Sequence, residues 1–288
     1  MRLIFIFGSL KKFNFLWRYD ERAIFWKVSA EAMSGSMMHA ITAMEARANR
    51  RPIDVHGQQY FLSGYIGMQP ERGTYVEGNE ENDNGLPQGF LVEQPPHSVT
   101  PPHFHEVNQF QVFVGGGGKI GKHDAAPVSL HYANGHTPYG PIAAGETGVQ
   151  YFTLRSAWDP GAKYMPQNRD KLKPGPRRFR LAAPFSLATV QELSARVSAD
   201  LETIIDVEDD GLQGHLLRLG PGETFQAPDP ATGGGQYHMV LTGSMARAAG
   251  DLDRLSCIFM ATVDAPLDVV AGPDGLELLM MQFPHSAA

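Results

Sequence analysis

The chain of 288 residues contains one cysteine, no long hydrophobic run and a modest share of charged residues, 19%. With Cys257 as its only cysteine, the chain cannot form an internal disulfide, which suits a reducing cytosol. No stretch approaches the roughly 18 apolar residues of a membrane span. The net charge of −7 offers no basic footprint for nucleic acid. These absences predict a cytoplasmic protein with neither a nucleic-acid partner nor a membrane span.

Glycine and proline are abundant instead, with 31 and 21 residues respectively. That excess over average usage favours a turn-rich, mostly β architecture over a helical one. Short apolar segments alternate with Gly/Pro turns from about residue 51 onward, which is typical of sandwiches and barrels. We therefore predict an all-β fold.

The N-terminal region differs in composition from the rest of the chain. Residues 1–30 carry six Lys/Arg against two acidic residues, together with eight aromatic residues. We expect residues 1–49 to form an N-terminal extension. It is either an appended segment outside the fold or an amphipathic arm that packs on a partner subunit or a membrane surface. The apolar run at 3–7 is short and is followed by lysines, so we do not expect a signal peptide.

A second change in composition occurs at residues 156–184, which are rich in proline, glycine and basic residues. This segment reads as a linker between two domains. The sequence thus predicts an N-terminal barrel over residues 50–155 and a C-terminal barrel over residues 185–288. Within the latter, a short helix is expected at 186–199, with Ser186 as its N-cap.

Histidine is concentrated in one part of the chain. Six of the eleven histidines fall within a window of about 40 residues, and His103 and His105 stand two apart. Residues i and i+2 of a strand point to the same face, so both imidazoles would project together. Gln109 opens the next apolar run and could add a side-chain oxygen. Two imidazoles and an oxygen are a plausible half-shell for a transition metal.

The segment from His103 to Gly116 resembles the first motif of the cupin superfamily. That motif has a His-x-His pair, a Glu three or four residues later, and then six residues followed by a Gly. Here Gln109 takes the Glu position and Gly116 follows at the family interval. The resemblance implies a jelly-roll barrel that holds one divalent transition metal, which could be Fe, Zn, Ni, Mn or Cu. His103, His105 and Gln109 would be its ligands.

The same interval recurs in the second half of the chain, where Gln236 stands seven residues before Gly243. Superposing Gln236 on Gln109 puts Pro230 and Thr232 where the first half has its histidine pair. The second half therefore resembles a cupin without its metal ligands. The resemblance implies two jelly-roll barrels in tandem, of which only the first binds metal.

The family's second motif, which supplies a third histidine ligand, is harder to place. The candidate region is 131–142, where we favour His136 as the ligand and keep His131 as the alternative. Tyr139 lies nearest the family's histidine position. Tyr139 and Tyr132 could provide a general acid, although tyrosine is also a common barrel-lining residue.

Gln109 bears on the chemistry because an amide oxygen, unlike a carboxylate, cancels none of a metal's charge. A shell of this kind favours an anionic ligand. Alternatively, Gln109 only orients a histidine by a hydrogen bond. Gln111 and Phe113 share its strand face and would line the substrate cavity.

The resemblance implies a metal-dependent enzyme that acts on a small, oxygen-rich organic anion, with dioxygenation as the first choice. Isomerase or lyase chemistry through an enolate is the alternative enzymatic activity. A bicupin that binds a small ligand without catalysis is the other alternative. We expect a homodimer, with the second barrel serving packing and dimerisation.

Overall fold

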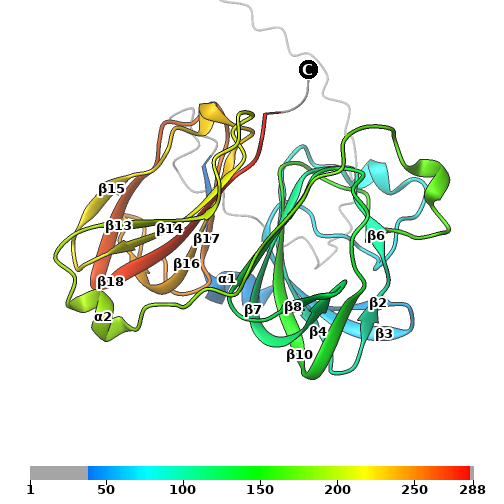
Figure 1. Cartoon of the computed structure of the whole chain (residues 1–288), viewed down its shortest axis with the longest axis horizontal. Coiled ribbons are helices and arrows are strands. Elements are labelled where there is room, and N and C mark those ends of the chain that lie inside the picture. The colour runs from blue at the N-terminus through cyan, green and yellow to red at the C-terminus, as the bar shows by residue number, and fades with distance from the viewer. Residues whose placement is uncertain (1–37, 286–288) are drawn as a thin grey trace, which may run out of the picture. The chain divides into compact units, whose positions relative to one another are not determined.

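The computed structural model describes residues 38–285, and these form two jelly-roll barrels in tandem, built from antiparallel strands (Figure 1). The all-β fold predicted from the sequence is confirmed. The described strands form a nine-stranded sheet, a seven-stranded sheet and a two-stranded ribbon. Within residues 38–285, no helix is both long enough and apolar enough to cross a membrane.

The N-terminal barrel is built on the nine-stranded sheet, in the order β12-β9-β7-β10-β4-β3-β2, with β5 beside β10 and β8 beside β7. Its strands are β2 (Arg51–Val55), β3 (Gln58–Ile66), β4 (Gln88–Gln94), β5 (Val99–Thr100), β7 (Gln109–Ile120), β8 (His123–Ala125), β9 (Ser129–Ala133), β10 (Ile142–Arg155) and β12 (Phe179–Ala182). The ribbon of β6 (His103–Phe104) and β11 (Lys163–Tyr164) adjoins them, and the loops contain the 3-10 helices η2 (Asn79–Asn82) and η3 (Arg169–Lys171).

The C-terminal barrel is built on the seven-stranded sheet, in the order β1-β17-β16-β18-β14-β13, with β15 beside β18. Its strands are β1 (His39–Ile41), β13 (Asp200–Ile205), β14 (Gln213–Leu219), β15 (Thr224–Gln226), β16 (Gln236–Met245), β17 (Cys257–Met260) and β18 (Asp268–Gln282). The helices α1 (Ala43–Ala48) and α2 (Val190–Ser194) and the 3-10 helix η4 (Pro230–Thr232) complete the described elements.

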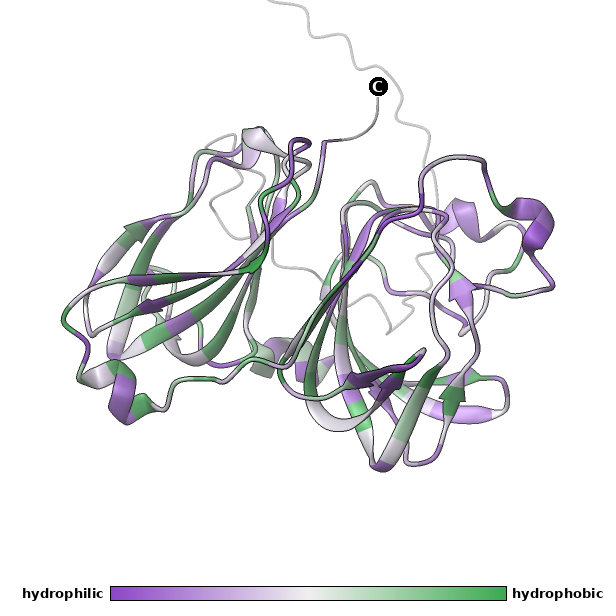
Figure 2. Ribbon diagram, viewed as in Figure 1, coloured by the Kyte–Doolittle hydropathy of each residue, from purple (hydrophilic) through white to green (hydrophobic). Residues whose placement is uncertain are grey.

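Strand β7 is buried on both of its faces. Phe110 and Val112 belong to a hydrophobic cluster that also contains Tyr237 and Phe283 of the C-terminal barrel. The rings of Phe110 and Phe283 lie 4.9 Å apart. The alternate residues of β7 face the interior of their own barrel instead, because successive side chains of a strand point to opposite faces. Figure 2 shows hydrophobic residues along the strands and hydrophilic residues in outer loops such as the one containing η3.

Both barrels contain the same tight turn, built on a glycine with a positive φ. Gly116 has a φ of +64°, and a Cβ at this position would lie 2.1 Å from the carbonyl oxygen of Gly148. Gly243 has a φ of +72°, and its Cβ would lie 2.1 Å from the carbonyl oxygen of Gly275. Only glycine fits such a left-handed, closely approached position. The equal spacing of Gln109–Gly116 and Gln236–Gly243 therefore reflects a shared turn.

Three boundaries predicted from the sequence are corrected by the structure. Residues 1–37 lie outside the described residues, but the rest of the expected extension is part of the fold, because β1 pairs with β17 and helix α1 follows it. The expected linker at 156–184 contributes β11 and β12 to the N-terminal barrel. The expected helix is shorter than predicted. It is capped by Thr189, whose side chain accepts from the Glu192 backbone N–H.

Candidate functional site in the N-terminal barrel

The N-terminal barrel contains a cavity of about 80 Å³. Its walls are apolar and are formed by Ile53, Val55, Leu62, Phe90 and Val92. Polar side chains that line it include His103, His105, Gln111, Tyr139, Tyr151 and Arg155. An apolar pocket with a few convergent polar groups is the usual form of a small-molecule site.

His103 and His105 are both buried and lie with their ring centroids 5.2 Å apart. Nδ1 of His103 lies 2.8 Å from the carbonyl oxygen of Pro101, which can only accept a hydrogen bond. Nδ1 of His105 lies 2.8 Å from a carboxylate oxygen of Asp159. Both rings therefore carry their proton on Nδ1 and offer a lone pair at Nε2.

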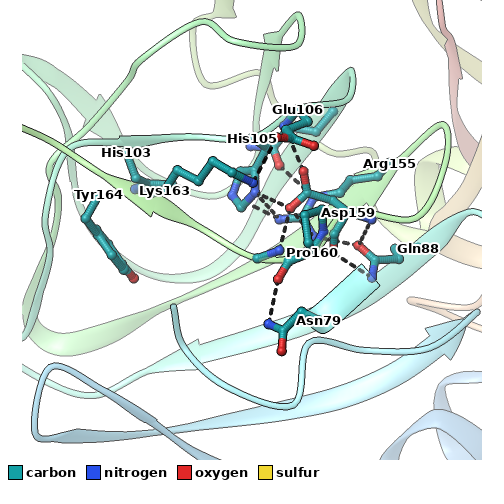
Figure 3. Close-up of polar contacts among 12 residues, drawn as sticks. Asn79, Gln88, His103, His105, Glu106, Arg155, Asp159, Pro160, Lys163 and Tyr164 are labelled. Atoms are coloured by element: carbon teal, nitrogen blue, oxygen red, sulfur yellow. Dashed lines mark hydrogen bonds and ion pairs between the residues drawn. The ribbon is translucent and has the colours of Figure 1, made fainter. Parts of the chain in front are cut away.

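Arg155, at the end of β10, is 2% exposed and lies beside this pair (Figure 3). Its guanidinium donates to Oε1 of Gln88 at 2.7 Å, to Oε1 of Gln109 at 3.2 Å and to Nε2 of His105 at 3.0 Å. Three acceptors thus share the five N–H groups of the guanidinium. Arg155 is a fixed cation at the cavity.

Asp159 lies at the centre of the polar contacts in Figure 3 and is fully buried. It accepts from the His105 ring and from the backbone N–H groups of Glu106 and Gly161. Burial alone would raise the pKa of this carboxyl. Its attraction to His105 and Arg155 and these hydrogen bonds outweigh burial and hold the pKa below its ordinary value. The ionised carboxylate orients His105.

A continuous chain of hydrogen bonds joins Arg155 to His103. Gln109 accepts from Arg155 at Oε1 and donates from Nε2 to the hydroxyl of Tyr139. Tyr139 in turn donates to Nε2 of His103 at 2.9 Å. Because Arg155 can only donate at one end of this chain and the carbonyl of Pro101 can only accept from His103 at the other, the direction of every hydrogen bond between them is fixed.

Burial keeps His103, His105 and Tyr139 uncharged around the guanidinium of Arg155. It lowers the pKa of His103 to about 3, with a further contribution from His105. Burial lowers the pKa of His105 to about 4, with Arg155 adding to the effect. Burial also raises the pKa of Tyr139. At neutral pH the site therefore presents uncharged imidazoles, a phenol and one guanidinium.

The structure brings some of the predicted site residues together and leaves others apart. His103, His105, Gln109, Gln111 and Tyr139 lie at or beside the cavity. Residues that do not line it are Phe113, Tyr132, His131 and His136.

For two of these residues, strand geometry gives the reason. Tyr132 follows His131 on β9 and so points away from the barrel interior, into the cluster between the barrels, where its ring lies 5.1 Å from that of Phe110. Phe113 points inward but packs against Tyr151, with ring centroids 5.4 Å apart.

Neither candidate for a third ligand joins the histidine pair. His136 lies in the loop after β9, where its ring packs 5.6 Å from that of Phe104. Its backbone has a φ of +59°. His131 is fully buried, donates from Nδ1 to Gln111 and has no hydrogen-bond partner for Nε2 in the described part of the chain.

The side chains at the cavity do not fit a resident divalent metal. Among residues 38–285, no group of three or more His, Cys, Asp and Glu side chains could hold a metal ion. Nη2 of Arg155 lies 3.1 Å from Nδ1 and 3.0 Å from Nε2 of His105, close to both ring nitrogens, and the Tyr139 hydroxyl takes up the Nε2 lone pair of His103. A guanidinium 3.0 Å from a ligand atom would also repel a second cation. Gln109 has its oxygen turned to Arg155, so it is not available as the predicted ligand.

Arg155 and Asp159 are the site residues that the sequence interpretation missed. Asp159 stands in a Pro/Gly-rich segment that reads as a linker, and it reaches His105 from 54 positions away. A signal for Arg155 did exist, because it follows Gly148 by seven residues just as Gln282 follows Gly275.

The C-terminal barrel has a polar pair in the equivalent place. Gln236 pairs with Gln282 in the sheet register, as Gln109 pairs with Arg155, and its Nε2 donates to Gln282 at 2.7 Å. His238 follows, buried, with Nε2 donating to Gln236. The adjacent hollow is about 10 Å³, which holds at most one water molecule. The Gln236–Gln282 pair therefore has a neutral amide where the N-terminal barrel has Arg155, and the hollow beside it is too small for a substrate.

Comparison with known proteins gives likeness in structure alone. No protein-family model and no curated protein matches the sequence. A proposed dioxygenase from Nostoc punctiforme has a similar solved structure, with a TM-score of 0.50 and 14% identity over 80% of this chain and 84% of that chain.

Two further solved structures are less similar, with TM-scores below 0.5. The pirin YhhW from Escherichia coli, in complex with nickel(II), has a TM-score of 0.47 and 11% identity over 87% of this chain and 100% of that chain. Quercetin 2,3-dioxygenase from Acinetobacter baumannii has a TM-score of 0.45 and 13% identity over 86% and 80%. The comparisons thus support the all-β, two-barrel fold and nothing finer.

Proposed function

We propose that the N-terminal barrel binds a small organic carboxylate against Arg155 and moves a proton on it, as isomerases and lyases that act through an enolate do. The observation that carries this proposal is the buried guanidinium of Arg155 at a cavity that no carboxylate lines. Asp159 is the buried counter-ion of Arg155 behind the cavity wall, at 3.9 Å, and the planar guanidinium still has N–H groups that match a carboxylate in geometry.

Asp159 does not face Arg155 from within the cavity. Its oxygens already accept three N–H donors, and the nearer one lies 3.9 Å from NH1 of Arg155. It does not line the cavity. A bound carboxylate is therefore the partner that faces Arg155 from the cavity side, in surroundings of low dielectric constant where the attraction is strong.

The neutral groups beside Arg155 suit proton transfer on such a ligand. The Nε2 lone pair of His103 accepts from the Tyr139 hydroxyl and becomes free to accept a proton when this hydroxyl turns to the ligand. In the proposed step the C–H bond next to the carbonyl breaks, an N–H bond forms at His103, and the electron pair moves to the carbonyl oxygen. Tyr139 and Arg155 stabilise the resulting enolate by donating hydrogen bonds to it.

A metal-dependent dioxygenase, which the sequence favours, is the second candidate function. One observation favours it: Nδ1 of both His103 and His105 is fixed by an acceptor, as it is in histidines that bind metals. Against it stand Arg155 beside His105 and the lack, among residues 38–285, of three or more His, Cys, Asp and Glu side chains grouped to hold a metal. A ligand-binding protein without catalysis is the outcome if binding occurs and proton transfer does not.

The test is hydrogen–deuterium exchange on 2-oxobutyrate and 2-oxoglutarate in D₂O, followed by NMR with full-length protein treated with a chelator. We expect exchange at the carbon next to the carbonyl, and its loss in His103→Ala. Phe113→Leu, which changes a residue away from the cavity, is the matched control. Exchange or oxygen uptake that depends on added iron, manganese, nickel, copper or zinc would overturn the proposal in favour of the second candidate.

The homodimer predicted from the sequence belongs to this proposal and is checked by sedimentation equilibrium. We also propose that the C-terminal barrel serves packing, because its polar pair Gln236–Gln282 leaves room for at most one water molecule.

A further inference from the structure

The cavity has a second cationic residue, at its mouth. Arg72 lies in the loop between β3 and η2, lines the cavity and is exposed to solvent. It has no hydrogen bond or ion pair with other residues in the range 38–285. Arg155, which is 2% exposed, lies at the inner end. The two arginines therefore mark the entrance and the depth of one small cavity.

Nothing in the cavity lining balances these two charges. Asp and Glu are absent among the residues that line it. The nearby carboxylates are engaged elsewhere: Asp159 with His105 and two backbone N–H groups, and Glu106 with Lys163 at 3.1 Å. A ligand with negative charge at both ends would be attracted by both guanidinium groups.

Apolar side chains form part of the cavity wall, namely Ile53, Val55, Leu62, Phe90 and Val92. Three hydroxyl groups of the lining are already engaged within the protein, because Tyr60 is hydrogen-bonded to Thr100 and Tyr164 donates to Gly73. Such a wall favours methylene groups over hydroxyl groups. The ligand that fits both features is anionic at its two ends and apolar between them.

We propose that the cavity takes a short aliphatic dicarboxylate, with Arg155 holding one carboxylate and Arg72 the other. This inference rests on the proposed function and names the substrate class of the same site. A dicarboxylate supplies one negative charge for each of the two arginines, whereas a monocarboxylate bound at Arg155 would leave Arg72 without an ionic partner.

The loop that carries Arg72 is held against the mouth of the cavity. The Tyr164 hydroxyl donates to the carbonyl oxygen of Gly73 at 2.7 Å, and the Tyr75 backbone N–H donates to Ala162 at 2.9 Å. A Cβ at Gly73 would lie 2.3 Å from the carbonyl oxygen of Asp54, so the backbone packs closely on β2. Arg72 is thus placed at the entrance before a ligand arrives, which lowers the cost of binding.

The test is isothermal titration of the full-length protein with three dicarboxylates, malonate, succinate and glutarate, and with the monocarboxylates of equal carbon number, propionate, butyrate and valerate. We expect at least one dicarboxylate to bind about tenfold more tightly than its monocarboxylate, since a second charge-assisted contact is worth about that much. Arg72→Gln should remove this difference by weakening the dicarboxylate alone. Arg47→Gln, on helix α1 and away from the cavity, should leave both affinities unchanged.

The outcomes separate this inference from the proposed function. Equal affinity for the two classes of acid, with no effect of Arg72→Gln, would overturn the dicarboxylate inference and leave carboxylate binding at Arg155 intact. Failure of all six acids to bind would overturn both.

Discussion

The guanidinium of Arg155 lies 3.0 Å from Nε2 of His105. This is the ring atom that would bind a metal if the His-x-His pair were a metal site. The other ring nitrogen of His105 is fixed by Asp159, which also lies 3.9 Å from Arg155. One carboxylate therefore orients the imidazole and balances the guanidinium. The positive charge of this site therefore belongs to the Arg155 side chain and not to a bound metal ion.

The first prediction concerns the coupling of Arg155 and Asp159. Arg155→Met should destabilise the protein by about 3–5 kcal/mol, because it leaves Asp159 as a buried charge without its counter-ion. Asp159→Asn should also destabilise. The double variant should lose less than the sum of the two, with a coupling of about 1–3 kcal/mol in urea unfolding. Strictly additive losses would show that the two side chains do not interact.

The second prediction compares two buried tyrosines. Tyr139→Phe removes the hydroxyl that joins Gln109 to His103, which leaves two buried polar atoms unpaired. We expect a loss of about 1–3 kcal/mol and slower proton exchange on the ligand. Tyr132 is the matched control, because its hydroxyl is buried without a hydrogen-bond partner in the described chain. Tyr132→Phe should be neutral or stabilising. An equal loss in both variants would contradict the hydrogen-bond assignment.

The third prediction tests the turn that both barrels share. Gly116→Ala and Gly243→Ala should each cost at least about 2 kcal/mol, since both positions have positive φ and lack room for a Cβ. At the neighbouring Gly117 a Cβ would meet nothing closer than 3.9 Å. Gly117→Ala should therefore be tolerated. Thermal unfolding of the three variants checks this, and a harmless Gly243→Ala would refute the equivalence of the turns.

The fourth prediction is a pH dependence of stability from His238, which lies outside the proposed site. Burial lowers its pKa to about 4 in the folded state, against about 6.5 in the unfolded state. Between these values the unfolded chain binds more protons, so stability is full above pH 6.5 and falls as the pH drops toward 4. The contribution of this one residue is up to about 3 kcal/mol over the window.

His238→Gln should make the pH dependence shallower by that amount. Urea unfolding of both proteins at pH 7.5 and pH 4.5 measures it, and comparing the two pH values cancels the pH-independent effect of the substitution. An unchanged difference between the two pH values would mean that His238 is protonated in the folded protein.

Local spacing in the sequence predicted a substantial part of this structure. The strand pattern indicated an all-β chain with two similar halves, and the i, i+2 rule placed His103 and His105 side by side. The interval from glutamine to glycine located the shared turn at Gly116 and Gly243. These features depend on neighbouring residues and on the steric limits of a single turn, so the order of residues is enough to find them.

The parts of the site that come from distant residues could not be found in this way. Arg155 reaches Gln109 because of the register between β10 and β7, and Asp159 reaches His105 by the path of the chain after β10. The pattern around residues 131–142 suggested His136 as a ligand, whereas the positive φ at that residue belongs to a loop outside the cavity. Register and loop path depend on the packed structure as a whole.

The most direct test of the account is a calorimetric titration of full-length, chelator-treated protein with succinate, run beside an elemental analysis of the same sample. We predict binding of one succinate per chain with no stoichiometric metal, and the same affinity after iron, manganese, nickel, copper or zinc is added back. Binding that appears only in a metal-loaded sample would contradict the central claim that Arg155 is the cation of this site.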